Sequence, residues 1–210
     1  MTDIKDTLGR AMPNARVRRF FLGVQEVMSA SGLNTILRQI GLPQYVGALP
    51  PDNAQTNLRA ANYAAILQAI ETYYGRGGRS TLTRIGYMAF EALLPRRPLT
   101  ASLYRLRMVM VGAHRKQRLA LDWLARELAA AHGQVAVELR GRHWWLLDYT
   151  SDATVGRTRE YPICWTTVGE IQAAMQWATG QEYEVTEHHC KALGAPACEF
   201  EIGSPISQKT

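Results

Sequence analysis

Residues 182–202 read EYEVTEHHCKALGAPACEFEI, and this stretch decides the fold of the last third of the chain. Apolar and polar residues alternate over 182–188 and again over 198–202, which is typical of half-buried β-strands. A glycine and a proline between the two runs predict a connecting loop. We therefore expect two antiparallel strands, with Cys190 at the end of the first and Cys198 at the start of the second.

The residues upstream extend this pattern. Residues 134–140 and 143–149 also alternate, and Gly141-Arg142 between them fits a two-residue hairpin turn. An amphipathic helix is expected at about 163–179. The order strand–strand–helix–strand–strand predicts an antiparallel sheet with one face packed by helices.

The first two thirds of the chain are helical by the spacing of their apolar residues. The sequence predicts helices over 16–29, from a cap at Ser31 or Asn34 to about 41, over 58–74, from Ser80 to 94, and one or two within 100–130, with a loop over 47–57. The predicted fold class is therefore α+β, a helical N-terminal half followed by a small antiparallel sheet packed by helices.

The chain has 210 residues and a formal net charge of +6, carried mainly by arginines of the first two thirds. These arginines are dispersed, which is typical of a solvated face and argues against nucleic-acid binding. No apolar run reaches the length of about 20 residues that crosses a bilayer. A basic stretch at 16–19 precedes the apolar run 20–24, but Gln25 and Glu26 end that run too early for a secretory signal. We therefore expect a cytoplasmic protein with no membrane span and no nucleic-acid partner.

All three cysteines lie after residue 160, at Cys164, Cys190 and Cys198. An odd number of cysteines without an export signal argues against structural disulfides. Cys164 lies at the start of the expected helix, and the final hairpin brings the other two together at the same end of the sheet. Three thiolates placed in this way suit a tetrahedral zinc ion. Free cysteines are also among the most buried residue types, so a role as small buried hydrophobes stays equally open.

A zinc site needs a fourth donor, and three candidates precede Cys190. Histidine is a more usual zinc ligand than glutamate, which favours His188 or His189. His188 also shares strand parity with Cys190, whereas Glu187 would need a bend in the strand to reach the same face. Residue chemistry alone therefore favours a histidine and leaves the choice open.

The spacing of these residues resembles that of a known family. The segment Pro162-Ile-Cys164-Trp165, then Gly169, then the run E-x2-C-x3-G-x3-C-x-F-x-I from Glu187 to Ile202 are similar to the 4-vinyl reductase domain. That small-molecule-binding domain is named after a bacteriochlorophyll-biosynthesis protein. The pattern also resembles the sensor domain of phenol- and xylene-responsive bacterial transcription activators and, more distantly, subunits of the Golgi transport particle. The aromatic sensors hold zinc with this spacing, so the resemblance implies Glu187 as the fourth ligand.

A shell of three thiolates and one carboxylate leaves no open position on zinc, so the implied ion is structural. The sequence contains no Gly-x-Ser-x-Gly nucleophile elbow and no dinucleotide-binding glycine fingerprint, so we do not expect an enzyme. The resemblance implies a stand-alone binding domain for a hydrophobic or aromatic molecule, with a tetrapyrrole of bacteriochlorophyll biosynthesis as one candidate. Two alternatives stay open: a reductase or accessory subunit acting on the 4-vinyl group of a chlorophyllide, and a dimeric signalling or scaffold module.

The pocket of such a domain is expected among aromatic residues, with histidines as polar anchors. Each of these residues, taken singly, is more often part of a core. The candidates are His114, His143, Trp144, Trp145 and Trp165. The helix after Cys164 reads GEIQAAM over 169–175, where the aromatic sensors carry small and aromatic residues, so the sequence leaves the identity of the ligand open.

The resemblance also suggests how the chain is divided. Helices over 1–57 are expected to form a homodimer, with the Phe20-Phe21 stripe as the contact surface. Residues 58–203 are expected to form the ligand-binding domain, and residues 204–210 a flexible tail.

Overall fold

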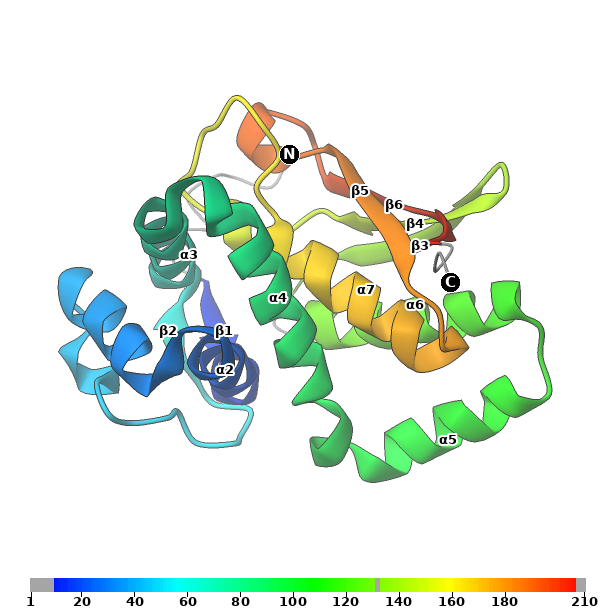
Figure 1. The fold of residues 1–210 in the computed structure, drawn as a ribbon, viewed down its shortest axis with the longest axis horizontal. Helices are drawn as coiled ribbons and strands as arrows, with labels where there is room; N and C mark the ends of the chain where they lie inside the picture. The colour runs from blue at the N-terminus through cyan, green and yellow to red at the C-terminus, as the bar shows by residue number, and fades with distance from the viewer. Residues whose placement is uncertain (1–9, 131–132, 207–210) are drawn as a thin grey trace.

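The computed structural model describes residues 10–130 and 133–206 of the chain (Figure 1). The N-terminal part contains the strands β1 (Ala11–Pro13) and β2 (Thr56–Arg59) and the helices α2 (Asn14–Gln39), α3 (Ala60–Tyr74), α4 (Gly78–Glu91), α5 (Pro98–Val109) and α6 (Ala113–Ala129). The C-terminal part contains the strands β3 (Val135–Arg140), β4 (His143–Asp148), β5 (Tyr183–His189) and β6 (Cys198–Pro205), with α7 (Trp165–Thr179) between β4 and β5.

The C-terminal strands form an antiparallel sheet in the order β3-β4-β6-β5. In Figure 1, α7 runs along one face of this sheet, and α4 packs against the other side of α7. The predicted α+β class and the order strand–strand–helix–strand–strand are thereby confirmed. The alternation in β5 and β6 places Tyr183, Val185, Phe200 and Ile202 in the core between sheet and helices.

The helices α4 and α7 cross with their backbones in contact. A Cβ atom on Gly169 would lie 1.9 Å from the carbonyl oxygen of Thr83, and one on Gly86 would lie 1.9 Å from that of Thr166. Only glycine allows so close an approach at these two positions. This contact gives Gly169, a member of the sequence pattern, a physical role: it brings α7 against α4.

The N-terminal segment belongs to the same core as the sheet. Phe20 and Phe21 in α2 are buried and pack with Tyr63 and Tyr45. The Phe20-Phe21 stripe is therefore not a free surface for dimerisation, and this expectation was wrong because α3 and α4 cover the stripe. The homodimer itself and the division of the chain at residue 57 remain predictions.

The ends of several elements differ from the sequence prediction. The helix α2 is interrupted at Ser29, whose φ of 70° and ψ of 165° are not helical. Ser29 Oγ, and not Ser31 or Asn34, accepts a hydrogen bond from the backbone N–H of Gly32 at the start of the second segment. The expected loop over 47–57 ends in β2, which pairs with β1; strands this short show no periodicity in the sequence.

Two further expectations were wrong at named residues. Ser80 does not cap α4, because the helix already begins at Gly78 and the Ser80 hydroxyl donates to the carbonyl oxygen of Gly77. The arginines are not all on a solvated face, since Arg16 and Arg19 are largely buried and paired with carboxylates. Residues 204 and 205 of the expected tail continue β6, while 207–210 lie outside the described residues. No helix in the described part of the chain is both long and apolar enough to span a bilayer.

Candidate metal centre and binding grooves

Three cysteines and one glutamate meet at one end of the sheet. Cys164 directly precedes α7, Glu187 lies in β5, Cys190 follows β5 and Cys198 begins β6. All four side chains are buried, and one potential ligand atom from each lies within 4.8 Å of the others. The Sγ atom of Cys164 lies 3.9 Å from that of Cys190 and 3.4 Å from that of Cys198, and the last two are 4.0 Å apart.

A bulge in β5 places Glu187 on the side of the cysteines. Glu187 pairs with Phe200 and His189 with Glu199, so the register shifts between Glu187 and His189. This extra residue supplies the bend that Glu187 needs to share a face with Cys190. His188 and His189 are both exposed, and His188 Nε2 lies 2.7 Å from Glu201 Oε2 on the other face of the sheet. The structure therefore brings Glu187 to the cysteines, and it directs both histidines away.

Burial sets the protonation of the cluster. It raises the pKa of the Cys164 thiol and raises the pKa of Glu187 to about 8. Hydrogen bonds from the thiols of Cys164 and Cys198 lower the pKa of Cys190. Glu187 Oε2 accepts a hydrogen bond of 2.9 Å from the backbone N–H of Cys164, at the positive end of the α7 dipole. Without a cation, most of these groups hold their protons at neutral pH.

The donor set fits a metal ion. The three Sγ–Sγ distances of 3.4–4.0 Å are too long for a disulfide, and they bracket the roughly 3.8 Å expected between two thiolates on one tetrahedral zinc ion. Glu187 Oε1 is buried and has no hydrogen-bond partner among the described residues. An unpartnered buried carboxylate oxygen beside three thiols is costly on its own, and a bound cation would satisfy it.

The five residues expected to line one pocket lie in three places. The rings of His114 and Trp144 are 4.9 Å apart and line a shallow, mostly apolar groove of about 610 Å³ between α6 and the edge of the sheet. His143 and Trp145 lie on the opposite face of the sheet, where His143 contacts Glu201. Trp165 lies at the start of α7, under the guanidinium group of Arg79. The structure therefore does not bring the five together.

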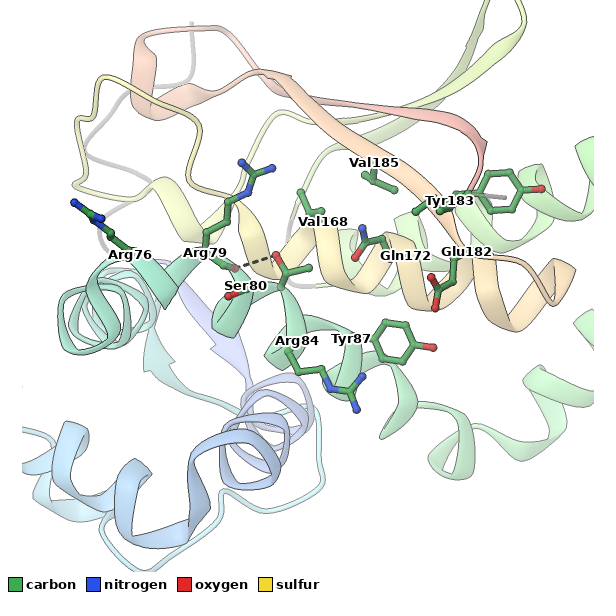
Figure 2. A pocket seen from close by; sticks show the side chains of 12 residues that line it. Arg76, Arg79, Ser80, Arg84, Tyr87, Val168, Gln172, Glu182, Tyr183 and Val185 are labelled. Carbon is green, nitrogen blue, oxygen red and sulfur yellow. Dashed lines mark hydrogen bonds between the residues drawn. The ribbon is translucent and has the colours of Figure 1, made fainter. Parts of the chain in front are cut away.

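A second groove of about 590 Å³ lies between α4, α7 and β5 (Figure 2). Its floor is buried and apolar, formed by Val168, Tyr183 and Val185. Its lining on the α4 side includes Arg76, Arg79 and Arg84.

The arginines of this second groove have no acidic partners. None of the three guanidinium groups forms an ion pair with a carboxylate within residues 10–130 and 133–206. Arg79 stacks on the Trp165 ring at 4.3 Å, and Arg84 lies 5.5 Å from the Tyr87 ring. Stacking holds a guanidinium plane in place and leaves its N–H edges available to a ligand.

The arginine-lined groove could not be predicted from the sequence, for a physical reason. Arg76 and Arg79 belong to the glycine-rich connection before α4 and to its first turn, a stretch that is typical of a solvated helix–helix link. The apolar floor comes from two other elements more than 80 residues further along the chain. Only the packing of α7 against α4 brings rim and floor together.

Comparisons with known proteins agree with this architecture. Residues 150–204 match the family model of the 4-vinyl reductase domain. Comparison with curated proteins finds no significant match. Among solved structures, an Fe(II) unliganded H-NOX protein from K. algicida has a TM-score of 0.63 at 11% identity, with 95% of this chain and 99% of that chain covered.

Two further structures resemble the chain. An H-NOX protein from S. oneidensis in the Fe(II)NO state has a TM-score of 0.52 at 14% identity, covering 90% of this chain and 99% of that chain. The phenol-responsive sensory domain of the transcription activator PoxR, with phenol, has a TM-score of 0.50 at 15% identity, covering 75% of this chain and 78% of that chain. At these identities the likeness concerns the fold alone. Residues 150–204, which carry all four candidate ligands, are therefore a 4-vinyl reductase domain, as the sequence pattern predicted.

Proposed function

We propose that this chain is a small-molecule-binding domain whose C-terminal lobe is held together by a structural zinc ion. Cys164, Glu187, Cys190 and Cys198 would hold the ion, and the observation that supports this is their convergence in one buried cluster. When bound, zinc supplies a closed four-coordinate crosslink and no catalytic position. The four residues themselves join the start of α7 to the last hairpin, where the sheet is small.

Metal analysis tests this proposal. We expect the purified protein to contain about one zinc per chain, and a Cys198→Ser variant to contain far less. A chain purified with no metal, and unable to bind added zinc under reducing conditions, would contradict the metal proposal. It would not bear on the grooves.

The ligand that best suits the arginine-lined groove is a hydrophobic molecule that carries carboxylates. The observation that carries this proposal is a buried apolar floor beneath guanidinium groups without acidic partners (Figure 2). An apolar body can cover Val168 and Val185 while a carboxylate accepts hydrogen bonds from Arg79 or Arg84. A carboxylated tetrapyrrole of bacteriochlorophyll biosynthesis is one molecule of this class. Haem, which is also a tetrapyrrole, is described for the H-NOX family, whose fold this chain resembles.

A matched pair of ligands tests the groove. Protoporphyrin IX carries two carboxylates, and its dimethyl ester has the same ring without those charges. We expect the acid to bind more tightly than the ester, and an Arg79→Gln/Arg84→Gln variant to lose roughly a hundredfold in affinity for the acid. Arg38→Gln, at an exposed arginine of α2, is the control. Equal binding of acid and ester, or no effect of the double variant, would argue against this site.

The His114–Trp144 groove supports a second candidate, a small aromatic ligand. Its walls are apolar, contributed by Val111, Leu119 and Leu139, and the fold resembles the phenol-responsive sensory domain of PoxR. The indole N–H of Trp144 already donates to the backbone oxygen of His114, so the His114 imidazole is the polar group left for a ligand hydroxyl.

Titration with phenol separates the two grooves. We expect His114→Ala to weaken phenol binding by about tenfold and to leave protoporphyrin binding unchanged. If the porphyrin and phenol compete for one site, the assignment of two grooves is wrong.

A further inference from the structure

The helix α5 turns a row of large apolar side chains away from the protein. In Figure 1 it lies at the lower edge of the molecule, joined to α6 by a short turn. The exposed fractions on its outer side are 80% for Leu99, 60% for Leu103, 68% for Leu106, 72% for Val109 and 87% for Met110. Spacings of three and four residues place these side chains along one face of the helix.

The opposite face of α5 attaches the helix to the core. Tyr104 and Met108 are buried, and the Tyr104 ring stacks on Trp123 of α6 with centroids 5.5 Å apart. Arg126 Nη1 also donates a hydrogen bond of 3.2 Å to the Tyr104 hydroxyl. The helix is therefore anchored in this orientation, and the outward face is not the result of a detached segment.

The surroundings of this apolar row are cationic. Between Glu91 and Asp122 the sequence contains no acidic residue and seven basic ones. They are Arg96, Arg97, Arg105, Arg107, Arg115, Lys116 and Arg118. Arg96, Arg97 and Arg118 have acidic neighbours at Asp52, Glu127 and Asp122. The other four form no ion pair within the part of the chain that the structure describes.

We propose that α5 docks on the surface of an anionic lipid bilayer. An apolar row bordered by unpaired cations is the arrangement of a helix that lies in the membrane interface, with its leucines among acyl chains and its arginines at lipid phosphates. The charge also selects against a second copy of this chain as the occupant. Two such faces would bring Arg105 and Arg107 of both copies together with no carboxylate nearby. This docking is independent of the proposed function, because neither groove nor the metal centre takes part in it.

Sedimentation of the full chain with vesicles tests the proposal. The vesicles are pure phosphatidylcholine, or phosphatidylcholine with about 30% phosphatidylserine. We expect binding to the anionic vesicles only. Arg105→Gln/Arg107→Gln should weaken it by about fivefold for each charge removed, and Leu103→Ser/Leu106→Ser by at least about tenfold for each leucine. All four side chains are exposed, so these variants keep the packed core.

Matched controls make the outcome specific to α5. Leu193→Ser removes an apolar side chain that is 43% exposed in another part of the molecule, and Arg38→Gln/Arg59→Gln removes two exposed cations; both should bind like the wild type. No binding to anionic vesicles, or binding unaffected by Leu103→Ser/Leu106→Ser, would overturn the proposal. So would a concentration-dependent dimer that this double variant abolishes, because α5 would then serve self-association.

Discussion

Replacing Glu187 by Gln should have opposite effects on the metal-free and the zinc-bound protein. Glutamine has the shape of a protonated glutamate and keeps an oxygen for the backbone N–H of Cys164. It cannot supply a negative charge to a cation. The substitution therefore separates a metal ligand from a buried polar residue of the core.

The magnitude follows from the pKa of Glu187, which burial raises from 4.5 to about 8. Between these two pH values the folded chain binds the proton more tightly than the unfolded chain, so the free energy of unfolding falls as the pH rises through this window. At pH 7 the folded state must still take up a proton that the unfolded chain has lost. That costs about 1.4 kcal/mol for each pH unit above 4.5, or about 3 kcal/mol in total.

Glutamine needs no proton, so metal-free Glu187→Gln should unfold at higher urea than metal-free wild type at pH 7, by up to about 3 kcal/mol. The difference should vanish near pH 4. In the presence of zinc the order should reverse, with zinc affinity at least about tenfold lower for the variant. The measurements are urea unfolding with a chelator and a reductant, and competition for zinc with a coloured chelator. Glu184→Gln, an exposed position of the same strand, should change neither.

Either of two results would refute this reasoning. If Glu187→Gln destabilises the metal-free protein at pH 7, the buried carboxyl does not carry the cost described. If zinc affinity is unchanged while Cys198→Ser abolishes it, Glu187 is not a ligand and water or another group completes the site.

Two other perturbations test the framework around the site. Gly169→Ala should lower the free energy of unfolding by about 1–3 kcal/mol in a urea titration, because its Cβ would lie 1.9 Å from the Thr83 oxygen, whereas Gly77→Ala, which meets only a Cβ at 3.9 Å, should stay within about 0.5 kcal/mol; equal effects would contradict the close crossing of α4 and α7. Burial raises the pKa of Asp148 from 3.8 to about 6, so its contribution to stability falls as the pH rises through that window. Asp148→Asn should therefore be up to about 3 kcal/mol more stable than wild type at pH 7.5 and no different near pH 3.5, and a variant that is less stable at both pH values would exclude this account.

Local patterns in the sequence determined the sheet and the position of the cysteines. Alternation over 182–188 and 198–202 depends only on neighbouring residues and on which side chains point the same way, so it survives without knowledge of the rest of the fold. The same pattern placed Cys190 and Cys198 at the two ends of one hairpin. Residue chemistry then left the partner of the cysteines open between Glu187 and two histidines, and the family resemblance favoured Glu187.

The tertiary structure decided what depends on contacts between distant segments. Strand parity fails at Glu187 because a bulge opposite Glu199 adds one residue, and no periodicity in the sequence reports a bulge. The expected aromatic pocket divides because Trp144 and Trp145, adjacent in one strand, point to opposite faces of the sheet. The arginine-lined groove and the exposed row of α5 arise from how whole helices pack. Burial and exposure of such surfaces are properties of the packed molecule, and the order of residues along the chain does not contain them directly.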